Sequence, residues 1–457
     1  MRTRRRRIFG LAMLVVLATL ASKGPRAFAL SAVNLSNTAG RSYNPTLGLN
    51  GVTLMAAWQD TTPGSDQIFM RRSPDTGMTW NPAVNVSQSP GYVLEYDWNF
   101  TGRFLFLAWS EWIDLPADAH IFLRKSTDGG ATFQPLVTLS PPGGTSRAPR
   151  IAVSGRNVYV AWQSTNSACA GICFRRSNDG GQSFSGAVSI AGAYSAGAQE
   201  LSLSASGPYV FALWMGGTAN SIYFTKSTDG GANFSPPVRV NASITDYYRQ
   251  APRMAVAIPN VYVVWSMAAY AYPSPPDHYL AVYTWSNDSG ATFDGGIHVL
   301  SQGDLSYDST YPEIIVNGTY VFVIWNANQG ARAKYISYVR SVDGGATWST
   351  FTHIADGLGW FGRPGPISWL LSGTDIHVAW ISPPGSTSVP TNIFYRRGTN
   401  AGTSFGTTVN LSGSVGSTGN SGNPRLLTAG RDVFAVWEDD TPGNLDIMFV
   451  RSQTGGF

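Results

Sequence analysis

Arginine, tyrosine and acidic residues collect between the β-rich stretches of this chain, and their types suit binding or catalysis. Guanidinium groups make two parallel hydrogen bonds to a carboxylate, so several arginines together suit an anionic ligand. A tyrosine beside a carboxylic acid offers the nucleophile and the acid–base group needed to cleave a glycosidic bond. The candidates are Arg147, Arg249 and Arg363 as an anion clamp, Glu200, Glu313 and Asp97 as acid–base groups, and Tyr247 and Tyr311 as nucleophiles.

The same residues also suit structural roles. Arg147 precedes Pro149 by two residues and Arg249 precedes Pro252 by three, each in a similar place between two strands. An arginine that recurs at one place could tie one loop to the next instead of binding a ligand. Catalysis, non-catalytic binding and a structural role therefore all stay open for these side chains.

A repeat that runs along the chain must position these loops. A short apolar segment of β-forming residues ends in Trp eight times, at intervals of 51 to 60 residues. An interval in the low fifties holds four short strands with their turns, which is one blade of a β-propeller. The sequence therefore predicts an all-β propeller of eight four-stranded blades, with seven blades as the alternative if one copy is distorted. The eight residues are Trp58, Trp109, Trp162, Trp214, Trp265, Trp325, Trp380 and Trp437.

A second motif follows each of these Trp residues, for example Ser-Thr-Asp-Gly-Gly-Ala-Thr-Phe from Ser126. Two degenerate copies begin at Gly398 and Ser452. An aspartate here can accept hydrogen bonds from its own turn, while glycine permits positive φ. Six equivalent copies cannot share one active site, so we expect their aspartates to be structural: Asp75, Asp128, Asp179, Asp229, Asp288 and Asp343.

This motif resembles the Asp-box (BNR) repeat of the sialidase-like superfamily, and the resemblance covers nearly all of the chain after residue 29. It implies a propeller whose ligand site lies on the face opposite the Asp-boxes. Sialidases open with a Phe/Tyr-Arg-Ile-Pro motif and have six blades, whereas this chain has Arg41-Ser-Tyr-Asn-Pro45 and eight repeats. We therefore expect recognition of a glycan or protein ligand, with a glycoside hydrolase of exo-α-sialidase type as the alternative, and the sequence leaves open whether the protein is an enzyme.

The repeats can be divided into strands by their alternation of apolar and polar residues. In the third copy the expected strands are 150–154, 158–162, 171–176 and 187–190. The eighth copy stops inside its last turn, and residues 31–36 resemble the outermost strands of other copies. We expect them to complete the last blade and close the ring. The second copy should be the most irregular, because its first strand, near 97–103, lacks the usual proline.

The basic character of the chain comes from its first residues. The whole sequence has 31 basic and 27 acidic residues, but residues 1–29 contain seven basic and no acidic ones, so the remainder has a net charge of −3. Arg-rich residues 2–7, an apolar run and Ala27-Phe28-Ala29 form the pattern of a secretory signal peptide. We expect one domain, 30–457, to be secreted as a monomer that binds an extracellular ligand. Neither a membrane span nor a nucleic-acid partner is expected.

Two smaller features concern cysteine and metal. Cys169 and Cys173 are the only cysteines, and in an exported protein their spacing predicts a local disulfide rather than a metal site. No cofactor is expected. Two similar acidic loops offer carboxylates that could hold Ca²⁺, although Asp before Thr-Pro-Gly is also a common turn former. The carboxylates are Asp60 with Asp66, and Asp439 with Asp446.

Overall fold

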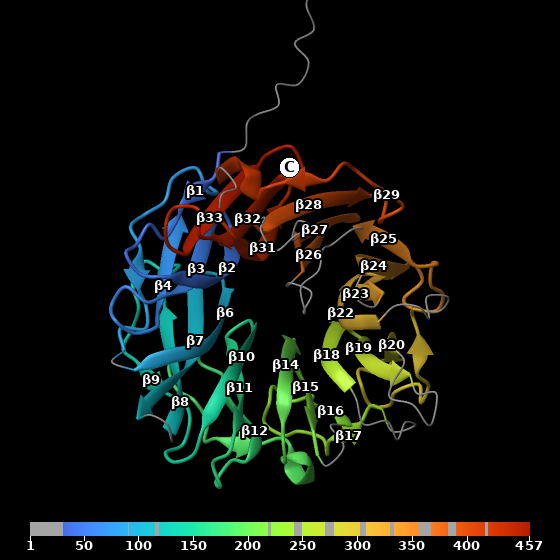
Figure 1. Ribbon diagram of the computed structural model, residues 1–457. Coiled ribbons are helices and arrows are strands. Elements are labelled where there is room, and N and C mark those ends of the chain that lie inside the picture. Colours follow the sequence, from blue (N-terminus) through green and yellow to red (C-terminus); the bar gives the residue numbers. More distant parts are fainter. Residues whose placement is uncertain are drawn as a thin grey trace, which may run out of the picture.

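Eight antiparallel sheets surround a central channel, so the chain is a β-propeller (Figure 1). The structure is a computed structural model that describes residues 31–89, 91–114, 118–217, 221–241, 249–269, 278–301, 308–329, 333–355, 367–382, 390–415 and 419–457. The prediction of eight blades is confirmed and the alternative of seven is wrong. The expected signal peptide lies outside the described residues.

Seven blades follow chain order from the innermost strand outward, and blade 8 does so except for its outermost strand, β1. Blade 1 contains β2 (Ser42–Asn50), β3 (Thr53–Asp60), β4 (Gln67–Ser73) and β5 (Val84–Asn85), and blade 2 contains β6 (Tyr92–Thr101), β7 (Phe104–Asp114), β8 (Asp118–Ser126) and β9 (Val137–Thr138). Blade 3 contains β10 (Ser146–Ser154), β11 (Asn157–Ser164), β12 (Gly171–Ser177) and β13 (Val188–Ser189), and blade 4 contains β14 (Gln199–Ser206), β15 (Tyr209–Gly216), β16 (Ser221–Ser227) and β17 (Val238–Arg239).

Blades 5 to 7 contain β18 (Arg249–Ala257), β19 (Asn260–Ala269), β20 (His278–Ser286) and β21 (His298–Val299); β22 (Asp308–Asn317), β23 (Tyr320–Gln329), β24 (Ala333–Ser341) and β25 (Thr352–Ala355); and β26 (Ser368–Ser372), β27 (Asp375–Ser382), β28 (Asn392–Thr399), β29 (Ser404–Phe405) and β30 (Val409–Asn410). Blade 8 contains β31 (Ser421–Ala429), β32 (Asp432–Asp439), β33 (Asp446–Ser452) and β1 (Val33–Asn34). Two short 3₁₀ helices, Gly192–Tyr194 and Ser412–Val415, complete the described elements, and no helix among these residues could span a membrane.

The start of the described chain closes the ring, as expected. Val33 pairs with Phe449 and Asn34 with Met448, so β1 is the outermost strand of blade 8. Ser36 Oγ donates to Asp446 Oδ1 at 2.7 Å and fixes the register. This pairing covers the edge of β33, which would otherwise be open to another chain.

The second repeat folds as an ordinary blade. Its innermost strand is Tyr92–Thr101 and begins earlier than the expected 97–103, with a register shift between Val93 and Glu95. The missing proline therefore does not remove the strand. In the third repeat the four expected strands are present, and its cysteines form a disulfide.

The core is divided between neighbouring blades. The buried apolar residues of the described chain form eight clusters, and each cluster draws on two adjacent blades, including blades 8 and 1. Seven of the eight repeat Trp side chains are fully buried, and Trp380 is 3% exposed. The Trp that marks each repeat is therefore part of an interface between blades.

An aromatic pair links most neighbouring blades at the periphery. The aromatic residue that ends an Asp-box-like motif packs edge-on against a third-strand aromatic of the preceding blade, with ring centroids 4.8 to 5.4 Å apart. Offset and edge-to-face geometry is the favourable one for such rings. The pairs are Trp80–Phe449, Phe234–Phe174, Phe293–Phe224, Trp348–Tyr283, Phe405–Tyr338 and Phe457–Tyr395.

The Asp-box-like motifs are turns whose aspartates bind their own loop. Ser126 Oγ donates to Asp128 Oδ1 at 2.7 Å, and Gly130 N donates to Ser126 Oγ at 2.7 Å. The backbone N–H and the hydroxyl of Thr132 both donate to the same carboxylate, at 2.9 and 2.7 Å. All six aspartates accept bonds of this kind, so each carboxylate is occupied within its turn.

The lowered pKa values of the aspartates in these turns predict that the protein loses stability in acid. Hydrogen bonds from Thr79 and Ser73 lower the pKa of Asp75 to about 2, and those from Ser341 and Thr347 lower the pKa of Asp343 to about 2. Because the folded-state pKa lies below the unfolded value of 3.8, the stabilisation is present above about pH 4 and is lost as the pH falls toward 2. We expect the urea midpoint to fall between pH 5 and pH 2.5.

The matched control is a double variant, Asp75→Asn with Asp343→Asn, whose urea midpoint should depend less on pH over the same interval. An equal pH dependence of the native protein and the variant would contradict the assignment.

Candidate functional site

The channel is lined at one level by a ring of eight equivalent positions, which we call the channel ring. Each position lies on an innermost strand and pairs with the residue that precedes a repeat Trp. Three of them are arginine, two are acidic and three carry a hydroxyl group. They are Thr46, Asp97, Arg150, Ser202, Arg253, Glu313, Ser368 and Arg425.

A β-bulge precedes the ring position in most blades. In the described chain, six innermost strands have a residue other than glycine with φ between 44° and 53°, always two residues before the ring position and at a shift of register. A bulge redirects the side chains that follow it, and non-glycine residues with positive φ cluster at functional sites. The six are Asn44, Ala148, Glu200, Ala251, Tyr311 and Asn423.

The two acidic ring residues bind the neighbouring blade. Asp97 Oδ2 accepts a bond from the backbone N of Ile151 at 2.9 Å, and Glu313 Oε2 accepts one from Trp369 Nε1 at 3.0 Å. Ser368 makes an equivalent bond, since its Oγ accepts from the backbone N of Leu426 at 2.9 Å. These oxygens therefore join successive blades.

The arginines of the ring are used differently. Arg150, Arg253 and Arg425 each donate through one terminal nitrogen to the carbonyl oxygen of the proline that precedes them, at 2.9, 3.1 and 3.3 Å. Arg253 also lies 3.4 Å from Glu200, and both side chains are well exposed, at 40% and 47%. A guanidinium has five N–H donors, so most of the donors on these three side chains have no partner among the described residues.

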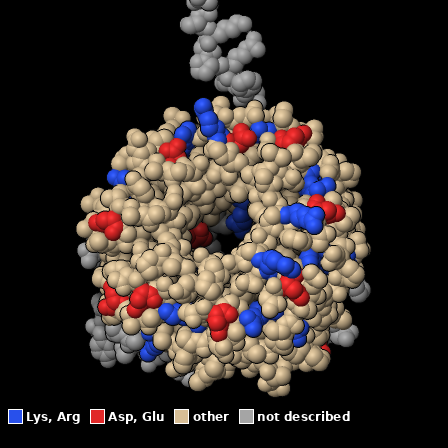
Figure 2. Space-filling model, turned by 180° about the vertical axis from the view of Figure 1, so that it is seen from behind, with Lys and Arg blue, Asp and Glu red and all other residues tan. Residues whose placement is uncertain are grey.

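Part of the ring opens into a cavity of about 340 Å³. Its wall comes from the innermost strands of blades 8, 1, 2, 3 and 4 and from the second strands of blades 1 and 3, at the ends that face away from the Asp-box-like turns. Figure 2 shows the channel open, with basic and acidic side chains on its wall. The polar side chains that line the cavity include Asn44, Gln59, Glu95, Arg150, Glu200 and Arg425.

Burial controls the ionisation of the inner acids and of one tyrosine. Burial raises the pKa of Asp97 and of Glu313, although Arg150 opposes the shift at Asp97 and Arg253 opposes it at Glu313. Burial also raises the pKa of Tyr96, whose hydroxyl donates to the carbonyl oxygen of Asn44 at 2.5 Å. A tyrosine held in this way is a poor nucleophile, because attack requires the phenolate.

Comparison with known proteins finds solved structures of similar fold. No protein-family model matches the chain, and no curated protein matches its sequence. An ulvan lyase of polysaccharide lyase family PL25 has a TM-score of 0.52 and 8% identity over 93% of this chain and 97% of its own. The polysaccharide lyase Uly1 has a TM-score of 0.50 and 10% identity over 78% and 88%. A Hadza microbial sialidase has a TM-score of 0.39 and 14% identity over 85% and 73%.

The fold is shared with polysaccharide lyase propellers. At these identities the likeness concerns the fold alone, and no functional residue of those proteins is transferred to this propeller.

The predicted site residues in the described part of the chain have different surroundings. Glu200 lines the 340 Å³ cavity, whereas Asp97 and Glu313 bind neighbouring blades. Arg147 lies over the ring of Trp112, 4.5 Å from its centroid. Tyr311 is a bulge residue with its side chain at 38% exposure, and its backbone N donates to Ser266 Oγ at 3.1 Å.

The other predicted residues stay untested. Tyr247 and Arg363 lie outside the described residues, and so does the side chain of Arg249. The site residues predicted from the sequence do not include Arg150, Arg253 and Arg425 of the channel ring. Their signal was the Pro-Arg pair that recurs in three copies, at 149–150, 252–253 and 424–425.

The carboxylates considered for Ca²⁺ accept bonds from the protein. Asp60 accepts from the indole Nε1 of Trp58 at 3.3 Å and from the backbone N of Thr62 at 2.8 Å. Asp439 accepts from Trp437 Nε1 at 3.1 Å in the same way. Among the described residues no group of three or more His, Cys, Asp or Glu side chains could hold a metal ion. Asp66 and Asp446 bind the Tyr43 hydroxyl at 2.6 Å and the Asn34 amide at 2.9 Å.

Proposed function

We propose that this propeller binds a polysaccharide that carries acidic groups, and that the binding site is the channel mouth around Arg150, Arg253 and Arg425. The observation that carries the proposal is the unequal use of the channel ring. Oxygens of its acids accept hydrogen bonds from neighbouring blades, while most N–H donors of its arginines have no partner among the described residues. Free guanidinium donors suit carboxylate or sulfate groups, which accept two parallel hydrogen bonds.

The rest of the cavity suits the hydroxyl groups of a sugar. Amide and carboxylate side chains of Asn44, Gln59 and Glu95 line it beside Arg150 and Arg425. Sugar hydroxyls donate and accept, so a wall that offers both kinds of group matches them. The volume of about 340 Å³ is within the range of ligand pockets, and the open channel leaves room for a chain to continue beyond it.

The fold of a polysaccharide lyase with a TM-score of 0.52 supports a glycan ligand. Cleavage of a glycosidic bond is the second candidate, because Tyr311 and Glu313 are two residues apart on the same strand. We favour binding, because Glu313 is buried and one of its carboxylate oxygens accepts a hydrogen bond from Trp369 Nε1 of the next blade.

The test compares ring arginines with a matched arginine elsewhere. Arg150→Ala and Arg425→Ala should each weaken binding of a uronate- or sulfate-bearing polysaccharide about 10- to 100-fold, since a hydrogen bond to a charged group contributes about 1.5–3 kcal/mol. Calorimetry at two salt concentrations measures the affinity, which should fall as salt rises.

Arg156→Ala is the control, because Arg156 is exposed on the turn at the other end of blade 3. Equal losses for Arg156→Ala and Arg150→Ala, or equal affinity for neutral and acidic polymers, would refute the proposal. Product formation from the bound polymer would support the enzymatic candidate instead.

A further inference from the structure

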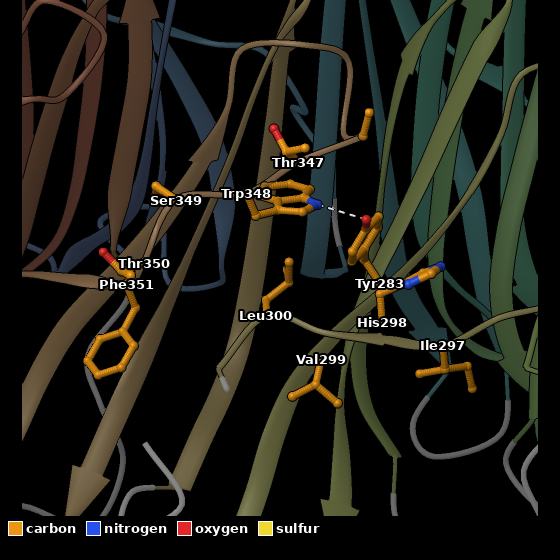
Figure 3. A pocket seen from close by; sticks show the side chains of 11 residues that line it. Tyr283, Ile297, His298, Val299, Leu300, Thr347, Trp348, Ser349, Thr350 and Phe351 are labelled. Atoms are coloured by element: carbon orange, nitrogen blue, oxygen red, sulfur yellow. Dashed lines mark hydrogen bonds between the residues drawn. The ribbon is translucent and has the colours of Figure 1, made fainter. Parts of the chain in front are cut away.

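A second cavity lies on the outer rim of the propeller, between blades 5 and 6 (Figure 3). Its volume is about 530 Å³, larger than that of the cavity at the channel. One wall comes from β20 and residues 297–300, and the other from residues 346–351, which connect an Asp-box-like turn to β25. It shares no residue with the channel cavity, so it has to be explained separately.

The residue at the edge of this groove differs from its counterparts in the other blades. His298 occupies the outer-strand position that pairs with Tyr283, and the residue equivalent to Tyr283 is aromatic in all blades except 1 and 2, where it is Met70 and Leu123. Thr352 stands there in blade 6. All six remaining blades have valine, namely Val33, Val84, Val137, Val188, Val238 and Val409.

The loop before His298 is also different. In the six other blades with an Asp-box-like aromatic before this position, four residue steps separate the two, but five separate Phe293 from His298. The longer connection contains Gly295, whose φ is +73°. It brings Asp294 Oδ2 to 2.5 Å from His298 Nε2, and Asp294 Oδ1 accepts from the Thr284 hydroxyl at 2.5 Å.

Blade 6 supplies aromatic and hydroxyl groups opposite. Trp348 Nε1 donates to the Tyr283 hydroxyl at 2.7 Å, which fixes the indole ring against blade 5. Figure 3 shows the rings of Trp348, Tyr283 and Phe351 around the aliphatic side chains of Leu300 and Val299. Thr347, Ser349 and Thr350 add three hydroxyl groups to the lining.

We propose that this rim groove is a second carbohydrate site, which takes a neutral sugar. Aromatic rings pack against the apolar C–H faces of a pyranose, while hydroxyls and an imidazole exchange hydrogen bonds with its O–H groups. The lining contains no Lys or Arg. Its one histidine, His298, is paired with the carboxylate of Asp294. The groove therefore lacks the cationic donors that an acidic sugar would require, in contrast to the channel ring.

The experiment uses His298→Val, because valine is the residue of six other blades and should preserve the fold. The native protein, His298→Val and Arg150→Ala are each applied to an array of neutral oligosaccharides, and affinities for bound sugars are measured by calorimetry. The native protein and Arg150→Ala should bind at least one neutral sugar equally, and His298→Val should weaken that binding at least tenfold at an unchanged melting temperature.

A second variant, Phe351→Ala, removes an aromatic ring of the lining and should lower the affinity for the same sugar. Absence of any neutral ligand for the native protein, or undiminished binding by both variants, would overturn the proposal. The acidic polysaccharide is tested in the same series, and Arg150→Ala should weaken its binding while leaving the neutral ligand bound. Undiminished acidic binding by Arg150→Ala would count against the channel site and not against the rim groove.

Discussion

Alanine in place of Trp109 should lower the free energy of unfolding by about 3–5 kcal/mol, as expected for a large aromatic side chain removed from a packed core. Trp109 is fully buried at the interface of blades 1 and 2. Its indole Nε1 also donates to Glu111 Oε2 at 2.8 Å, so the substitution removes a donor from a buried carboxylate as well as apolar contacts. Urea denaturation followed by circular dichroism measures the loss.

Phenylalanine substitutions separate the two contributions. Trp162 is equally buried, but its Nε1 has no hydrogen-bond partner in the described part of the chain. Trp109→Phe should therefore cost about 1–2 kcal/mol more than Trp162→Phe, because only the former leaves a buried acceptor short of a donor. An equal or smaller cost for Trp109→Phe would show that the bond to Glu111 contributes no net stability.

The closing strand gives the second large effect. Leu35 is fully buried between blades 8 and 1, and its backbone N donates to the Ile447 carbonyl at 2.7 Å. Leu35→Asp places an unpaired carboxylate in this interface and should cost more than the about 2–5 kcal/mol typical of Leu→Ala. We expect a large fall in melting temperature and, because the edge of β33 is released, concentration-dependent aggregation seen by light scattering.

Val33→Asp is the control, since Val33 lies two residues earlier, on β1, but is 44% exposed. It should change the melting temperature little. A comparable fall for both variants would mean that any charge on or beside β1 disrupts the blade, and that burial of Leu35 is not the cause.

The fold could be predicted from the sequence because it is local and repeated. Each Trp segment and each aspartate turn specifies one hairpin, and the likeness of residues 31–36 to other outer strands was enough to predict ring closure. The start of β6 was not predictable, because it is fixed by pairing with β7 rather than by a proline.

The site was harder to predict because it depends on register across blades. Asp97 and Glu313 are acidic in the sequence, but only the packed structure reveals that Ile151 and Trp369 occupy their oxygens. Arg150 and Arg425 are 275 positions apart and reach one cavity only after the ring is closed and the bulges have redirected the strands. No local pattern contains that information.

The division of the core between neighbouring blades determines how the molecule should unfold. No blade contains a complete cluster by itself. A blade detached from its neighbours would therefore lose the apolar packing on both of its faces at once. Linear repeat arrays can fray from their ends, but this ring has as many interfaces as blades and no terminal unit. We expect one cooperative transition that begins in blade 8, at the pairing of β1 with β33, since these two neighbouring strands are far apart in the chain.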